Sequence, residues 1–430
     1  MRIEELEPGQ RPTSDQMNRS LGVNEQAIEV ARGIIKDVRE FGDEALYRYS
    51  LEFDKVRMRQ LRVLETEIMK ASRTVSRSVQ DALKIAASRI REFHERQVQQ
   101  SWFVTRTDGA LLGCRVTPLE SVGIYVPGGR ASYPSTVLMN AIPAQVAGVN
   151  RIVMVTPPRS DGTIDPTVLL AAQMAGVSEI YAVGGAQAIA ALAYGTDEIS
   201  AVDKITGPGN EYVAAAKRLV SGDVGIDMIA GPSEVLILAD EDADASLIAI
   251  DLLAQAEHDP KATTFLVTTD EDLVDEVIER IEFYLAQSPR QEITKASIDK
   301  NCIVFICPDL PTAILAVNTV APEHLEILMD QPFELLGLIE NAGAIFLGPW
   351  TPESVGDYIA GANHTLPTGG TARFSSPLSV DDYVKRTNII SYSYSALKKD
   401  QRAVCDLARS EGLWAHGKAV ELRFEERDEN

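Results

Sequence analysis

The chain has 430 residues, 45% hydrophobic and 24% charged, a balance that predicts a soluble globular protein of several domains of about 150 residues each. Its net charge of −22 and the lack of a basic block argue against nucleic-acid binding, so small molecules are the expected ligands. The four cysteines have no CxxC spacing, which indicates neither a disulfide framework nor a thiolate zinc site and favours a reducing compartment.

The N-terminus and the apolar runs argue against secretion and membrane insertion. The start, "MRIEELEPGQRP", is acidic where a signal peptide needs a basic segment and an apolar run. The longest apolar candidate, "AVGGAQAIAALAYG", is shorter than the roughly 20 residues of a membrane helix. We therefore expect a cytoplasmic protein with no contact to a membrane.

The first hundred or so residues show hydrophobic positions at spacings of three and four, which predicts helices. One such stripe runs from Ile28 to Val38 and another from Leu83 to Phe93. His94 lies beside the second stripe among charged residues, so we expect a solvated surface histidine.

From residue 121 short β-rich runs alternate with helical ones, first from "SVGIYV" to "EYVAAAKRLV" and then from "EVLILA" to "AGAIFLG". Such alternation predicts parallel sheets with helices on their faces. The expected fold class is α/β, with two tandem Rossmann-like parallel-sheet units, a helical N-terminal arm and a small helical C-terminal domain whose helices cover roughly 397–409 and 411–424. The expected domains are 1–115, 116–232, 233–375 and 376–430.

Glycine-bearing loops follow the strands of the first unit: "YVPGGR", "VTPPRS", "AVGGAQ" and "ITGPGN". Ligands of open α/β sheets bind beyond the carboxyl ends of the strands, and helix N-termini there suit a pyrophosphate, so a nucleotide site is one interpretation. The alternative is that the glycines only make tight turns, since no GxGxxG follows a strand in this unit. Tyr125, Gln187 and Asn210 at the same edge favour binding.

Histidines and acidic residues mark a second candidate site in "LAQAEHDP". Gln255 and His258 are three residues apart, so they address one point on a helix that the following Asp-Pro pair is expected to end, while Glu257 faces elsewhere. An amide and an imidazole alone make a poor metal site, and Asp357 and His416 are the best further ligands by residue type. The spacing around His416 by itself favours a histidine buried in a helix contact.

In "VAPEHLEI" Pro322 suits the first position of a helix, which would place Glu323 and His324 in its first turn. The helix dipole would then favour a carboxylate and a neutral imidazole. An acid/base pair is one interpretation. The other is a plain helix N-terminus with an acidic residue.

Eight motifs in order resemble the histidinol dehydrogenase family over essentially the whole chain. They are "YVPGGRASYPSTVLMNAIPA", "VGGAQAIAALAYGT", "GPGN", "AGPSE", "AQAEHDP", "APEHLE", "GANHTLPTGGTARFSSPLSV" and "EGLWAHGKA". The resemblance implies a zinc-dependent homodimeric NAD oxidoreductase of histidine biosynthesis. Such an enzyme oxidises L-histidinol through bound L-histidinaldehyde to L-histidine, using two NAD molecules in succession.

The resemblance also implies roles for single residues. The zinc ligands would be Gln255, His258, Asp357 and, from the partner subunit in a shared active site, His416. The substrate would contact these ligands and also Ser233, His324, His364 and Glu411. NAD would contact Tyr125, Gln187 and Asn210 in the 116–232 unit. His324 would act as the base of both hydride transfers, and Glu323 would activate water.

Related zinc- and NAD-dependent enzymes oxidise other small alcohols, including sulfonated diols. His364 and Glu411 favour histidinol here, because they belong to the histidinol pocket of the family. Two hypotheses from other classes stand beside this one: a zinc hydrolase in which Glu323 activates metal-bound water, and a binding protein without catalysis.

Overall fold

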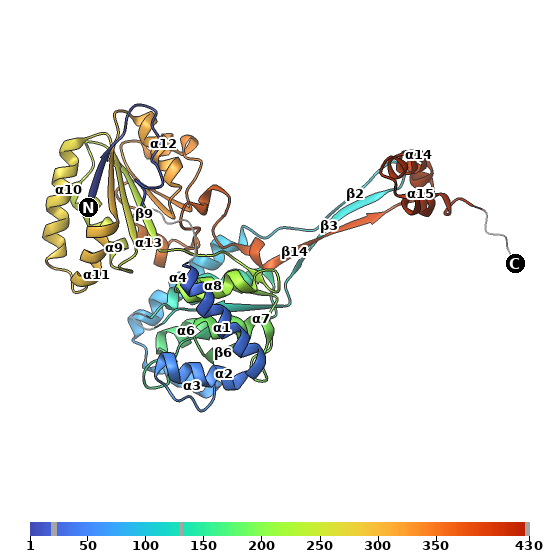
Figure 1. Ribbon diagram of the computed structural model, residues 1–430, viewed down its shortest axis with the longest axis horizontal. Helices are drawn as coiled ribbons and strands as arrows, with labels where there is room; N and C mark the ends of the chain where they lie inside the picture. The colour runs from blue at the N-terminus through green and yellow to red at the C-terminus, as the bar shows by residue number, and fades with distance from the viewer. Residues whose placement is uncertain (19–23, 129–131, 426–430) are drawn as a thin grey trace. The chain divides into compact units, whose positions relative to one another are not determined.

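A computed structural model describes residues 1–18, 24–128 and 132–425 of the chain (Figure 1). It has two compact units. Unit 1 comprises Met1–Gln97 and Leu119–Tyr383, and unit 2 comprises Val98–Pro118 and Val384–Asn430.

The first sheet of unit 1 has five parallel strands, namely β4 (Ser121–Tyr125), β5 (Arg151–Thr156), β6 (Glu179–Ala182), β7 (Lys204–Thr206) and β8 (Gly225–Ile226). Their order is β6-β5-β4-β7-β8. Along β5, Ile152 and Met154 face one hydrophobic core and Val153 and Val155 face another. The sheet is thus buried on both faces, which is why its strands read as continuous apolar runs. The helices that alternate with these strands are α5 (Pro134–Ala147), α6 (Pro166–Met174), α7 (Gly185–Tyr194) and α8 (Glu211–Val220).

The N-terminal helices pack onto the helices of this first sheet. They are α1 (Glu25–Phe41), α2 (Asp43–Tyr49), a π-helical turn (Ser50–Asp54), α3 (Glu65–Thr74) and α4 (Arg77–Glu95). Helix α1 contacts α7 and α8, and α4 contacts α5 and α6. The hydrophobic stripes predicted from the sequence largely match the buried faces of α1 and α4, but Phe93, the last residue of the second stripe, is exposed.

His94 lies in the core, so the prediction of a solvated surface histidine is wrong. Its exposed fraction is 0%, whereas that of the neighbouring Phe93 is 42%, because the buried face of α4 continues from Ile90 to the position four residues on. The Nδ1 atom of His94 donates to Oε1 of Gln97 at 2.7 Å, and Nε2 accepts from the amide nitrogen of Asn363 at 3.3 Å. Both ring nitrogens are therefore satisfied, as burial requires.

The second sheet of unit 1 has six parallel strands, namely β1 (Arg2–Glu5), β9 (Glu234–Ala239), β10 (Thr263–Thr268), β11 (Cys302–Ile306), β12 (His324–Leu328) and β13 (Ala344–Leu347). Their order is β1-β11-β10-β9-β12-β13. The helices are α9 (Ala245–Ala256), α10 (Glu271–Leu285), α11 (Gln291–Asn301) and α12 (Leu310–Val320), followed by a 3-10 turn (Pro332–Leu338). Helices α9, α10 and α11 cover one face and α12 the other (Figure 1), since Val235 and Ile237 belong to one core and Leu236 and Leu238 to the other.

The end of unit 1 is mostly loop, with α13 (Glu353–Tyr358) and two 3-10 turns (Thr371–Arg373 and Val380–Tyr383). The predicted fold class, two tandem parallel α/β units, is confirmed. The N-terminal region is not entirely helical as expected. Its first residues form strand β1, which pairs with β11 of the second sheet. The division into four domains stays a prediction.

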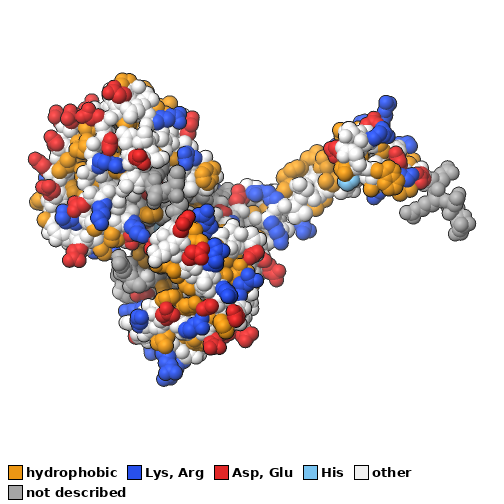
Figure 2. Space-filling model, in the orientation of Figure 1, with side chains coloured by type: hydrophobic (Ala, Val, Ile, Leu, Met, Phe, Trp, Pro, Cys, Tyr) orange, Lys and Arg blue, Asp and Glu red, His pale blue; other side chains and the backbone are white. Residues whose placement is uncertain are grey.

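Unit 2 contains an antiparallel ribbon of β14 (Val384–Ser391), β3 (Leu111–Pro118) and β2 (Trp102–Thr105), then α14 (Tyr394–Ser410) and α15 (Trp414–Glu421). The two C-terminal helices agree with the sequence prediction. Many hydrophobic side chains of this unit are exposed (Figure 2), including Trp102 at 55%, Tyr394 at 71% and Trp414 at 77%. Within the described residues, no helix combines the length and apolar character that crossing a membrane demands.

Candidate active site

A cluster of polar side chains lies at the amino ends of β9 and β12 in the second sheet. Glu234 is the first residue of β9, and His324 is the first residue of β12, its partner strand. Helix α9 connects the parallel strands β9 and β10, so it returns to the amino edge and brings Gln255 there. This edge is opposite to the one at which open α/β sheets usually bind ligands.

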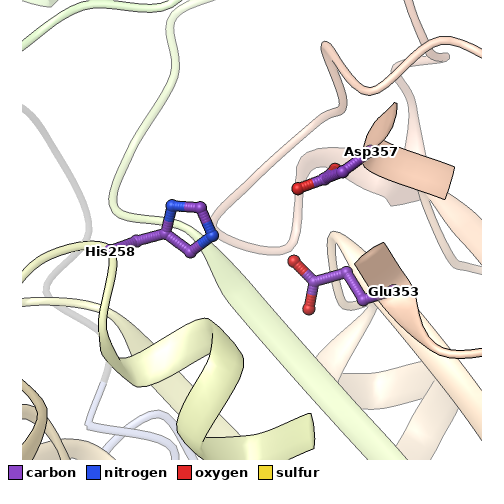
Figure 3. A group of neighbouring side chains, drawn as sticks. All are labelled: His258, Glu353 and Asp357. Atoms are coloured by element: carbon purple, nitrogen blue, oxygen red, sulfur yellow. The ribbon is translucent and has the colours of Figure 1, made fainter. Parts of the chain in front are cut away.

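Three side chains of this cluster are placed to hold a metal ion. Ligand atoms of His258, Glu353 and Asp357 all lie within 4.8 Å of one another, and Figure 3 shows the imidazole facing the two carboxylates. Glu353 and Asp357 are four residues apart in α13, which puts them on one face of that helix. Imidazole and carboxylate are common zinc ligands, so the donor set fits zinc. The sequence predicted His258 and Asp357 as ligands but not Glu353. The signal for Glu353 is its four-residue spacing from Asp357 in "ESVGD", which places both carboxylates on one face of a helix.

Gln255 extends the cluster from the last turn of α9. Its side chain is buried, with 1% exposed. The Gln255 amide can take two orientations that exchange its oxygen and nitrogen. With the nitrogen toward Glu353, it donates to Oε1 and Oε2 at 2.9 and 3.0 Å. With the oxygen toward Glu353, that oxygen would face only acceptors. The amide oxygen therefore points away from Glu353.

The helix around "QAEHDP" ends earlier than expected. Its last residue is Ala256, and His258 lies in the following turn, where its backbone N–H donates to the carbonyl of Gln255 at 3.2 Å. A residue that precedes proline is disfavoured in helices, so the chain leaves α9 before the Asp-Pro pair. Glu257 is exposed, in agreement with its predicted direction.

His324 is held as a neutral imidazole with one free nitrogen. Its Nδ1 atom donates to the backbone carbonyl of Glu234 at 3.0 Å, and its buried Nε2 atom has no hydrogen-bond partner among the described residues. Burial lowers the pKa of His324, although Asp357, whose Oδ1 lies 3.9 Å from Nε2, acts in the opposite direction. A neutral ring with an unprotonated Nε2 is the form that a general base needs.

Glu323 lies beside His324, but not in the first turn of a helix as expected. Helix α12 ends at Val320, Ala321 has a left-handed φ of 46°, and a strand begins at His324. The predicted helix that would begin at Pro322, and its dipole, are therefore not present at this pair. Burial raises the pKa of Glu323 well above its ordinary value, while the backbone N–H of Glu234, which donates to Oε2 at 2.9 Å, favours the ionised form.

A cavity of about 150 Å³ opens beside the cluster, lined by His324, Asp357 and His364 with apolar groups that include Phe346 and Leu366. A dry cavity of roughly this volume can hold a benzene ring, so a five-membered ring fits. His364 donates from Nδ1 to the backbone carbonyl of Asp357 at 3.1 Å, and burial lowers the pKa of His364.

Ser233 also lies at this amino edge, directly before β9, and is half-buried. Its backbone carbonyl accepts from the N–H of Thr263 at 3.0 Å, which ties the start of β9 to β10.

The expected nucleotide-binding residues lie at the carboxyl edge of the first sheet. Tyr125 ends β4, and its hydroxyl accepts from the backbone N–H of Gly185 at 3.1 Å. Asn210 caps α8 by accepting from two backbone N–H groups. Gln187 is buried in α7, and its Oε1 atom has no hydrogen-bond partner among the described residues. Gly129 and Arg130 of the "YVPGGR" loop lie outside the described residues.

The "GPGN" loop approaches this edge closely through a glycine. Gly207 has a φ of 106°, and a Cβ atom there would collide with the backbone carbonyl of Tyr125. Here glycine is required both by the backbone conformation and by the close approach.

Two expected site residues belong to unit 2. Glu411 follows α14 as its C-cap, and His416 lies in α15. Both are exposed, so the interpretation of His416 as a histidine buried in a helix contact is wrong. The buried member of that turn is Gly417, which packs against Cys405 and Ala408 of α14.

Comparisons with known proteins agree with these observations. The family model described as histidinol dehydrogenase matches residues 17–424. The histidinol dehydrogenase of Bacillus cereus is 54% identical over 404 residues, which cover 94% of each chain. That of Bacillus subtilis (strain 168) is 52% identical over 399 residues, or 93% of each chain. The crystal structure of histidinol dehydrogenase from Elizabethkingia anophelis has a TM-score of 0.92 at 36% identity, covering 99% of this chain and 98% of that one. This chain therefore belongs to the histidinol dehydrogenase family.

Proposed function

We propose that this NAD-dependent oxidoreductase converts L-histidinol through L-histidinaldehyde to L-histidine at a zinc site in the second sheet of unit 1. The observation that carries the proposal is the position of His258, Glu353 and Asp357, whose side chains could hold a metal ion, next to Nε2 of His324, which has no hydrogen-bond partner among the described residues. A general base, metal ligands and a ring-sized cavity thus lie together at one edge of the sheet.

Gln255, His258 and Asp357 would hold the zinc ion, with one ligand from each of three types: amide oxygen, imidazole and carboxylate. Bound zinc would supply a Lewis acid that orients the nitrogen atoms of the substrate. Ser233, at the same amino edge, and His364, which lines the cavity, are the further substrate contacts that we propose in unit 1.

The residues around the cavity account for both oxidation steps. In the first step the carbinol carbon gives a hydride to NAD, and His324 Nε2 takes the hydroxyl proton, which leaves an aldehyde. Glu323 in its ionised form then takes a proton from water as the oxygen adds to the aldehyde carbon. The protonated His324 returns its proton to the aldehyde oxygen, which gives the neutral hydrate and restores the base. The resulting hydrate gives its hydride to a second NAD and a proton to His324, which yields the carboxylic acid.

NAD would bind at the carboxyl edge of the first sheet through Tyr125, Gln187 and Asn210. The unpartnered oxygen of Gln187 supports this proposal, because a buried polar atom normally has a partner, and a ligand hydroxyl or amide would supply one. The hydroxyl of Tyr125 and the side chain of Asn210 already make local hydrogen bonds, so their contacts would be additional ones.

We further propose a homodimer in which Glu411 and His416 complete the active site of a second copy of the chain. Both side chains are exposed in unit 2, whose exposed aromatic residues are typical of an interaction surface. Mixing inactive His416→Ala chains with inactive His258→Ala chains should restore activity, since some mixed dimers contain one intact site. No recovery in the mixture, with exchange of subunits confirmed, would contradict a shared site.

The choice of substrate is tested by comparing L-histidinol with a sulfonated diol. The zinc-loaded protein should form NADH from L-histidinol and NAD far faster than from the diol, because His364 lines the cavity and Glu411 would complete it. No increase in NADH absorbance with L-histidinol, when zinc is confirmed to be bound, would contradict the proposal. A cytoplasmic location stays a prediction.

A further inference from the structure

The carboxylate of Glu353 lies between the proposed zinc ligand Gln255 and the proposed base His324. Its two oxygens lie 2.9 and 3.0 Å from one side-chain amide atom of Gln255, and they accept hydrogen bonds when that atom is the nitrogen. Oε1 of Glu353 is 3.7 Å from Nδ1 of His324. The residue is almost fully buried, with 4% exposed. Glu353 is not among the zinc ligands, bases and substrate contacts proposed above.

Glu353 is itself held by a hydrogen bond to a second acidic residue. Its backbone N–H donates to Oε1 of Glu326 in β12 at 2.7 Å. This bond ties the start of α13, which carries the Glu353 side chain, to the neighbouring strand.

We propose that Glu353 is a positioning residue that fixes the Gln255 amide, so that its oxygen rather than its nitrogen is presented to zinc. A primary amide has a donor and an acceptor side of nearly equal shape, and only its oxygen is a ligand for a cation. Both oxygens of the Glu353 carboxyl group lie within hydrogen-bond distance of the same amide atom. A carboxyl group carries at most one proton, so at least one of the two oxygens must accept, which the amide nitrogen allows and the amide oxygen does not. This inference rests on the proposed zinc site.

A direct role of Glu353 as a zinc ligand is the competing explanation, since its oxygens belong to the metal-binding cluster. Binding to zinc would compete with the two hydrogen bonds that these oxygens accept from Gln255. The two roles predict different zinc affinities for the double variant. If Glu353 acts through Gln255, its substitution does not weaken zinc binding further once Gln255 has been replaced. If Glu353 is an independent ligand, its substitution weakens zinc binding in either background.

The experiment measures zinc affinity by competition with a chelator of known affinity, for the wild type and for Glu353→Gln, Gln255→Ala and the double variant. Glu353→Gln should weaken zinc binding by about 10- to 100-fold, the usual effect of losing a partner that orients a ligand. The double variant should bind no more weakly than Gln255→Ala. Glu257→Gln is the matched control, because it makes the same chemical change at an exposed site two residues from Gln255, and its affinity should equal that of the wild type.

The zinc affinities of the three variants distinguish these roles. Wild-type affinity in Glu353→Gln, with a loss in Gln255→Ala, would overturn the positioning role and leave the zinc site intact. A double variant that shows the product of both losses would make Glu353 a ligand and also overturn it. Wild-type affinity in Gln255→Ala, or no zinc binding by the wild type, would refute the zinc site itself. If Glu353→Gln does not fold by circular dichroism, Glu353→Asp replaces it, and its displaced carboxylate should also weaken zinc binding, with unchanged affinity overturning the inference.

Discussion

The Nδ1 atom of His324 lies 3.0 Å from the backbone carbonyl oxygen of Glu234, at the first residues of two neighbouring parallel strands. A carbonyl cannot donate, so Nδ1 carries the proton and the lone pair of Nε2 is free. This one contact sets the tautomer of the ring, and burial keeps the ring neutral by lowering its pKa. The backbone of β9 therefore holds the proposed base in the tautomer that can accept a proton at Nε2.

Replacement of His324 by Asn should slow both oxidation steps. The amide of Asn cannot take a proton at neutral pH, and the loss of a general base typically costs about 10²- to 10⁴-fold in rate. The measurement is the rate of NADH formation with L-histidinol and, separately, with L-histidinaldehyde. A wild-type rate in either reaction would show that another group takes the proton in that step.

Replacement of Glu323 by Gln should impair mainly the second step. Gln keeps an oxygen that can accept from the backbone N–H of Glu234, a contact of 2.9 Å in the wild type, so the local structure should persist while the base is lost. We expect a fall of about 10²-fold or more in the oxidation of the aldehyde and little change in the oxidation of the alcohol. Equal losses in the two reactions would contradict a role in water activation.

Removal of zinc should destabilise the protein more at high pH than at low pH. Burial raises the pKa of Glu323 and Glu353 well above the usual 4.5, and burial together with Asp251 raises that of Glu326 to about 8. These groups bind protons more tightly in the folded state, so the metal-free protein loses stability as the pH rises from 4.5 through the folded-state pKa values. Zinc competes with protons for its ligands, so its stabilising effect grows over the same range.

The measurement is the difference in Tm between zinc-loaded and chelator-treated protein, at about pH 6 and about pH 8, the range in which the pH dependence is expected. We expect the larger difference at the higher pH. A difference that stays constant or shrinks as the pH rises would contradict the coupling between the metal and the buried carboxyl groups.

His94 should make the stability of unit 1 sensitive to acid. Burial lowers its pKa below the 6.5 of an unfolded histidine, so the unfolded chain binds the additional proton first as the pH falls through that value. The contribution of neutral His94 to the free energy of unfolding is therefore complete above about pH 6.5 and declines as the pH falls below that value. His94→Gln removes the titrating group while keeping a donor and an acceptor, and its urea unfolding midpoint should fall less than that of the wild type between neutral pH and about pH 5.5. Equal declines would show that His94 is protonated in the folded state.

The sequence predicted those features that depend on local pattern. Buried parallel strands and the helices between them have distinct apolar periods, so the two α/β units could be read directly. The three-residue spacing of Gln255 and His258 predicted one common helix face, but His258 lies after the end of α9 and is exposed, as Glu257 is, while Gln255 is buried.

Features that depend on distant contacts could not be read in this way. The burial of His94 depends on Asn363, which lies 269 residues further along the chain. The proximity of Glu353 to His258 depends on the tertiary contact between two segments that are far apart in the sequence. In "VAPEHLEI" the proline fits the start of a helix and also the approach to a strand, and the pairing of β12 between β9 and β13 decides for the strand.

The most direct test of the whole account is the number of NADH molecules that zinc-loaded protein forms from a limiting amount of L-histidinol with excess NAD. Oxidation of an alcohol to a carboxylic acid removes four electrons, and each NAD accepts two. We predict two NADH per L-histidinol, with L-histidine as the product and no NADH after zinc is removed. One NADH per L-histidinol with aldehyde as the product, or none at all, would contradict the account.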